Sequence, residues 1–193
     1  MMNRMRVFLC CFGCLYFILL SGCRQEEMTN TPDDKLAQLA AMEARFAEFD
    51  AKAAALPYVP IETTEDGVLI LADANFMEAV NQGGILVVDF WMDNCPPCED
   101  MVPVFKGLAR LYKDTMRFAK LHDSNRIMTE KYLIQGFPTF VIFTDGKPAT
   151  MLTGSQPQER FQMILDTILL DYQAKQDARQ DGHTGDRPAM QKD

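Results

Sequence analysis

Two cysteines stand three positions apart where a predicted strand meets a predicted helix. Residues 85–98 read Ile-Leu-Val-Val-Asp-Phe-Trp-Met-Asp-Asn-Cys-Pro-Pro-Cys, and the apolar run at their start predicts a strand buried on both faces. Apolar residues at helical spacing follow, so Cys95 should lie near a helix N-terminus. The helix dipole and the unpaired N–H groups there favour a Cys95 thiolate. Cys98, one turn further on, is close enough to form a disulfide, so the pair can supply an attacking thiolate and a resolving thiol.

A Cys-x-x-Cys pair is also half of a common zinc site, so two alternatives stay open. A structural zinc ion would need two more ligands, and the other downstream candidates are His122 and His183. The pair could also be inert and buried. The remaining cysteines all fall within the first 23 residues, so they do not indicate a disulfide scaffold: Cys10, Cys11, Cys14 and Cys23.

The composition indicates one globular domain with appendages. The chain has 193 residues, and 48% hydrophobic residues are enough for a packed core. The formal charge is −8, and the chain without residues 1–22 carries −10, because that segment contains only Arg4 and Arg6 as charged residues. A negative chain without a basic stripe argues against nucleic acid as a partner.

The first 22 residues have the pattern of a secretory signal. A short basic segment precedes an apolar run over residues 7–20, which is too short to span a bilayer comfortably. Leu20-Ser21-Gly22-Cys23 resembles the lipobox of bacterial lipoproteins. This resemblance implies removal of the signal, acylation of Cys23 and a lipid anchor outside the cytoplasmic membrane. The alternatives are an ordinary cleaved signal, an uncleaved anchor and a buried helix. Arg24, where inner-membrane lipoproteins carry Asp, favours the outer membrane by the same resemblance.

Residues 35–56 predict an amphipathic helix that starts after the acidic Asp33-Asp34 and stops before Pro57. Two interpretations stay open: a helix that docks on the domain or acts as a spacer, and a short homodimeric coiled coil through residues 36–56. At the other end, residues 173–193 are polar and charged, which predicts a disordered tail. The apolar stripe of the helix consists of Leu39, Met42, Phe46, Phe49, Ala53 and Leu56.

Between these ends, residues 61–172 alternate strands and helices. Asp73 is the expected N-cap of the first of these helices, and Asp145-Gly146 signals a hairpin turn between the last two strands. The order predicts an α/β domain with a mixed central sheet and helices on both faces. Strands are expected at 68–71, 85–90, 116–121, 139–144 and 149–152, and helices at 73–81, after Cys95, at 126–133 and at 157–172.

This segment is similar to the thioredoxin family over roughly residues 61–172. The resemblance implies a compact thioredoxin fold, because the distance from Cys98 to Pro138 leaves no room for an inserted subdomain. It also implies a thiol–disulfide oxidoreductase that acts on protein disulfides or dithiols and needs no metal or organic cofactor. Besides the two cysteines, the matching residues are Val88-Asp89-Phe90-Trp91, Pro103, Ala119-Lys120-Leu121, Gly136-Phe137-Pro138-Thr139 and Gly154.

The resemblance implies catalytic roles for four residues. Cys95 corresponds to the exposed nucleophile and Cys98 to the buried resolving thiol. Asp89 corresponds to a buried carboxylate whose raised pKa lets it exchange a proton with Cys98, and Lys120 to a lysine beside that carboxylate. The alternatives for Asp89 and Lys120 are a hydrogen-bonded core aspartate and a solvated lysine.

The resemblance also implies a substrate-binding surface around the cysteines. Pro138 corresponds to a cis-proline that faces the disulfide, where the neighbouring backbone pairs with a bound substrate strand. An ordinary turn proline is the alternative. The surface is made of Pro96, Pro97, Phe137, Pro138 and Gly154.

The chain departs from the family next to the cysteines. Asn94 stands where thioredoxins usually have Trp, Pro96 where they have Gly, and Glu99 in place of a cation. These changes remove N–H donors and a favourable charge near Cys95, so the reduction potential, substrate range and direction of electron flow stay open. A reductase outside the cytoplasm implies a membrane electron donor. The alternatives are a dimeric isomerase and a metal-handling or binding module that uses the two cysteines as ligands.

Overall fold

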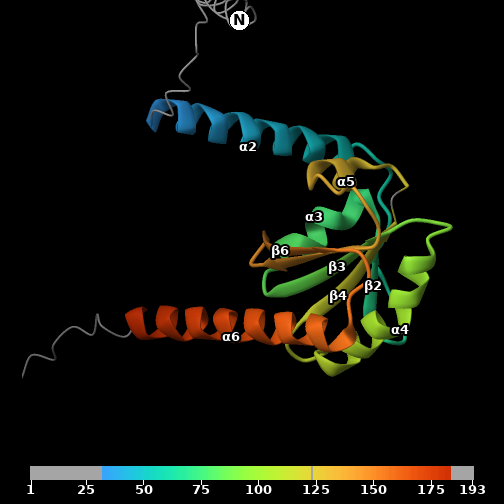
Figure 1. Ribbon diagram of the computed structural model, residues 1–193. Helices are drawn as coiled ribbons and strands as arrows, with labels where there is room; N and C mark the ends of the chain where they lie inside the picture. Colours follow the sequence, from blue (N-terminus) through green and yellow to red (C-terminus); the bar gives the residue numbers. More distant parts are fainter. Residues whose placement is uncertain (1–31, 123, 184–193) are drawn as a thin grey trace, which may run out of the picture. The chain divides into compact units, whose positions relative to one another are not determined.

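The computed structural model describes residues 32–122 and 124–183 (Figure 1). The chain divides into two compact units between Met42 and Glu43, within helix α2 (Pro32–Ala54). The predicted signal and lipobox cysteine Cys23 lie outside the described residues, as do residues 184–193 of the predicted tail. Within the described part, no helix is long and apolar enough to span a bilayer.

A six-stranded mixed sheet forms the centre of the domain, in the order β1-β2-β4-β3-β5-β6. Strand β3 pairs in parallel with β4 and antiparallel with β5. All its residues from Ile85 to Phe90 are buried, as predicted for a strand covered on both faces. The strands are β1 (Glu62–Thr63), β2 (Val68–Leu71), β3 (Ile85–Trp91), β4 (Arg117–His122), β5 (Thr139–Thr144) and β6 (Lys147–Thr153).

Helices cover both faces of this sheet (Figure 1). Helices α4 (Pro96–Leu111) and α6 (Gln158–His183) pack against Val87 and its neighbours, whereas α3 (Asp73–Asn81) and α5 (Ile127–Lys131) pack against Val88 and Phe90. Because side chains alternate along a strand, Asp89 points to the α4 side, as Val87 does. The predicted α/β architecture with helices on both faces is confirmed. The short strand β1 was not expected, because two exposed residues carry no apolar pattern.

The predicted N-cap of helix α3 is wrong by one residue. The cap is Ala72, whose N–H donates to the Asn75 side-chain oxygen at 2.9 Å. Asp73 is instead the first helical residue, and its buried carboxylate accepts the N–H of Met128 at 2.9 Å. A contact across 55 positions in the chain therefore decides where the Asp73 side chain lies, and no local pattern reveals it.

The predicted disordered tail is wrong for residues 173–183, because helix α6 continues to His183. The added turns contain Gln, Ala, Lys and Arg, which favour helix without needing an apolar face. The turn between β5 and β6 also holds this helix. Asp145 accepts the Tyr172 hydroxyl at 2.8 Å and pairs with Arg179 at 3.3 Å.

The second half of α2 packs on its own domain. Phe49 and Ala53 are buried, and the Phe46 ring lies 6.5 Å from that of Tyr132. Lys131 of α5, only 4% exposed, forms an ion pair with Asp50. These contacts favour the docked-helix interpretation for this half of the apolar stripe. The compact unit that contains the sheet begins at Glu43, whereas the sequence suggested a start near Ile61.

Replacing Asp50 with asparagine should destabilise the domain by about 2 kcal/mol. The change leaves the buried Lys131 ammonium without its carboxylate, and the 39% exposure of Asp50 keeps the cost below that of a fully buried pair. Urea unfolding at pH 7 measures the effect, with Glu43→Gln, an exposed change on the same helix, as the control. Equal stability of Asp50→Asn and wild type would contradict a stabilising role for the Lys131–Asp50 ion pair.

Candidate functional site

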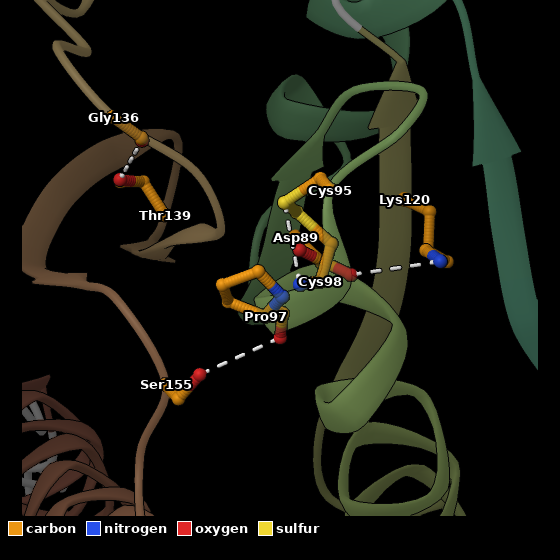
Figure 2. The surroundings of a disulfide bond; sticks show 8 residues. All are labelled: Asp89, Cys95, Pro97, Cys98, Lys120, Gly136, Thr139 and Ser155. Carbon is orange, nitrogen blue, oxygen red and sulfur yellow. Dashed lines mark hydrogen bonds and ion pairs between the residues drawn. A yellow bond between two sulfur atoms is a disulfide. The ribbon is translucent and has the colours of Figure 1, made fainter.

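Cys95 and Cys98 form a disulfide at the N-terminus of α4 (Figure 2), with an S–S distance of 2.05 Å. Cys95 is the N-cap residue, and Pro96 and Pro97 occupy the first helical positions. Because proline has no N–H, the first helical N–H is that of Cys98, and it donates to Cys95 Sγ at 3.3 Å. Cys95 is 8% exposed and Cys98 3%. The resemblance implied an exposed Cys95, but in this disulfide-bonded form Cys95 is buried and only slightly more open than Cys98.

Asp89 is a buried carboxyl group beside the disulfide (Figure 2). Its Oδ1 has no hydrogen-bond partner among the described residues. Lys120 stands opposite it on β4, with Nζ 3.7 Å from Oδ2. Burial raises the pKa of Asp89 from 3.8 to about 6, although Lys120 opposes this shift. A carboxyl group with this pKa can accept and release a proton near neutral pH.

A small pocket of about 130 Å³ opens beside this group. Cys98 and Lys120 line it together with Trp91, and the acidic side chains of Asp93 and Glu99 lie at the same opening. A larger groove of about 770 Å³ lies between the β5–β6 turn and α6, and neither cysteine lines it. We therefore associate the chemistry with the small pocket.

The peptide bond between Phe137 and Pro138 is cis, which matches the geometry that the resemblance implied. Pro138 is buried, and its carbonyl accepts the N–H of Gly154 at 2.8 Å. The next residue, Ser155, donates its hydroxyl to the Pro97 carbonyl at 3.5 Å (Figure 2). The residues after β6 therefore bridge the cis-proline loop and the first turn of α4.

The predicted surface residues differ in exposure. Pro96 and Pro97 are exposed, whereas Phe137 and Gly154 are half-buried. Ser155 was missed, and its residue type alone carries no signal of a contact with Pro97. The substrate-binding role of this surface stays a prediction.

His122 was considered from the sequence only as a zinc ligand. It lies next to the site, where its ring is 4.5 Å from that of Trp91 and its Nε2 is 3.2 Å from Asp93 Oδ2. Alternation along β4 could have placed it on the same face as Lys120. In the part of the chain that the structure describes, no three His, Cys, Asp or Glu side chains form a group that could hold a metal ion.

Comparison with known proteins identifies the family. The thioredoxin family model matches residues 67–167. The thioredoxin of Alicyclobacillus acidocaldarius subsp. acidocaldarius is 36% identical over 102 residues, which cover 52% of this chain and 97% of that protein. The thioredoxins of Staphylococcus haemolyticus (strain JCSC1435) and Staphylococcus aureus (strain Mu50 / ATCC 700699) are both 35% identical over 103 residues, 53% of this chain and 98% of each relative. The chain therefore belongs to the thioredoxin family and is a thiol–disulfide oxidoreductase.

Proposed function

We propose that the protein is a lipid-anchored oxidoreductase of the bacterial cell envelope that exchanges disulfides with other proteins through Cys95 and Cys98. The observation that carries the exchange role is the disulfide at the start of α4 beside the buried Asp89. Two thiols can carry the two electrons of the reaction, so the exchange requires no metal ion or organic cofactor.

The reduction of a substrate begins with the Cys95 thiolate. It attacks one sulfur of the substrate disulfide, whose other sulfur leaves and takes a proton from water, and a mixed disulfide forms. The Asp89 carboxylate then accepts the Cys98 proton. The Cys98 thiolate attacks Cys95 Sγ and releases the second substrate sulfur, which leaves the disulfide found in the structure. Oxidation of a substrate dithiol is the same sequence in reverse.

The substrate strand is proposed to lie across the cis-proline loop. Pro138 has no N–H, and its carbonyl already accepts the N–H of Gly154. Backbone pairing with a substrate would therefore use Phe137, while the exposed Pro96 and Pro97 provide apolar contact beside the sulfurs.

Acylation of Cys23 is expected to hold the protein at a membrane. When bacteria that make the wild-type protein are fed a labelled fatty acid, the protein should carry the label and stay in the membrane fraction. The Cys23→Ala protein should not carry the label. Cys14→Ala, which changes a cysteine of the predicted signal, is the matched control and should keep the label. Equal labelling of Cys23→Ala and wild type would contradict the anchor. Density separation of the two membranes tests the outer-membrane location suggested by Arg24.

One partner follows from this proposal. A reductase outside the cytoplasm has to be recharged, so we propose a membrane electron donor that reduces the Cys95–Cys98 disulfide. The isomerase alternative needs a homodimer through residues 36–56. Phe46, Phe49 and Ala53 of that segment already pack within one chain, which favours a monomeric oxidoreductase.

A further inference from the structure

Four side chains form two cross-strand pairs next to the disulfide. The register sets Asp89 opposite Lys120 and Trp91 opposite His122. Residues two apart on a strand share a face, so all four lie on the side of the sheet that α4 covers. The pairs are joined diagonally, because Lys120 Nζ lies 4.7 Å from the centre of the Trp91 ring. Contacts therefore run without a break from His122 through Trp91 and Lys120 to Asp89.

His122 also holds the loop that leads into Cys95. Its Nε2 is 3.2 Å from Asp93 Oδ2, and its Nδ1 is 2.6 Å from the Ser124 hydroxyl. The loop turns sharply at Asn94, whose φ of 54° lies in the left-handed region. A non-glycine residue in that region needs support from its surroundings. The His122–Asp93 contact lies one residue before this turn and two residues before the sulfur, and the Asp93 side chain is 74% exposed there.

We propose that His122 is a positioning residue for disulfide exchange. It fixes the Trp91 ring, which in turn keeps the Lys120 ammonium near Asp89, and through Asp93 it steadies the loop before Cys95. The proposal rests on the proposed exchange function of Cys95, Cys98 and Asp89. His122 contacts Trp91, Asp93 and Ser124, so it acts through these neighbours and not on the reacting sulfurs directly.

The expected consequence is a slower resolving step. Without the imidazole, the Trp91 ring can rotate, and the Lys120 ammonium loses the ring that it lies over. Asp89 then accepts the Cys98 proton in a less well-ordered site. We expect His122→Ala to lower kcat about tenfold with little change in KM, because misplaced groups slow chemistry more than they weaken binding.

The emission of Trp91 gives a direct readout of this arrangement, since the chain contains a single tryptophan. The full chain in detergent is compared as wild type, His122→Ala, His122→Phe, His122→Gln and Lys113→Ala, an exposed control. Insulin reduction gives kcat and KM, and urea unfolding monitors the fold. We expect altered Trp91 emission and slow turnover in His122→Ala. His122→Phe should restore the emission but only part of the rate, because phenylalanine cannot bind Asp93.

Each outcome decides the proposal. Wild-type kcat in His122→Ala, or slow turnover with unchanged Trp91 emission, would overturn it. If His122→Ala does not fold, the decision passes to His122→Phe and His122→Gln: wild-type kcat in both overturns the proposal, and a loss of kcat in either one supports it. Equal activity of wild type and Cys95→Ser would instead refute the exchange function itself, so the two failures are distinguishable.

Discussion

Replacing Cys95 with serine is expected to lower insulin reduction at least about a thousandfold, because a serine hydroxyl stays protonated at neutral pH and cannot form the mixed disulfide. Cys98→Ser should behave differently. It keeps the attacking sulfur but cannot resolve the intermediate, so it should accumulate a covalent complex with the substrate. Turbidity during insulin reduction measures the first effect, and gel electrophoresis without reductant shows the second.

The anchor provides a control for this experiment. Cys23→Ala changes a cysteine outside the folded domain, so the purified variant should reduce insulin at the wild-type rate even though it no longer labels with fatty acid. Two results would contradict the assigned roles. One is equal insulin reduction by Cys95→Ser and wild type. The other is a trapped complex in Cys95→Ser but not in Cys98→Ser, which would exchange the roles of the two sulfurs.

Asp89→Asn is expected to stabilise the protein at pH 7 to 8 by about 3 kcal/mol, because it removes a charge that is costly to bury. The pKa of Asp89 is raised from 3.8 in the unfolded chain to about 6 in the folded protein, so between these values the folded state binds more protons. Wild-type stability should therefore fall as the pH rises from about 4 to about 6 and then level off. The variant should not show this fall, and the two curves should meet below pH 4.

Urea unfolding at a series of pH values measures this difference. Asp114→Asn changes an exposed aspartate in the turn after α4 and should leave the wild-type pH dependence unchanged. Asp89→Asn should also slow the resolving step, since the amide cannot accept the Cys98 proton. Stability that is equal in wild type and Asp89→Asn at every pH would show that folding does not change the pKa of this carboxyl group, against the raised pKa.

The central part of the fold could be predicted because its pattern is local. The apolar run of β3 and the helical spacing after Cys98 place the sulfurs at a strand–helix junction without any tertiary information. The hairpin at Asp145-Gly146 is equally local. These features explain why the helix start at the cysteines and the β5–β6 turn agree with the structure.

The features that were missed depend on contacts between distant segments. The Asp73 side chain accepts the N–H of Met128, and the extension of α6 is held by Asp145 in the β5–β6 turn. The position of His122 beside Trp91 requires the register between β3 and β4, which a single sequence does not specify. The predicted strand ended at residue 121, one residue short of His122, so neither its face nor its neighbours were predicted.

The two prolines at the start of α4 affect whether the mixed disulfide between Cys95 and a substrate reacts forward or reverts. Among the described contacts, one backbone N–H, that of Cys98, reaches the Cys95 sulfur, where a helix without Pro96 and Pro97 could offer more. A less stabilised thiolate is a poorer leaving group. The reverse reaction of the mixed disulfide has to expel the Cys95 thiolate, so it is slowed. Cys98 therefore has more time to attack the mixed disulfide and release the substrate.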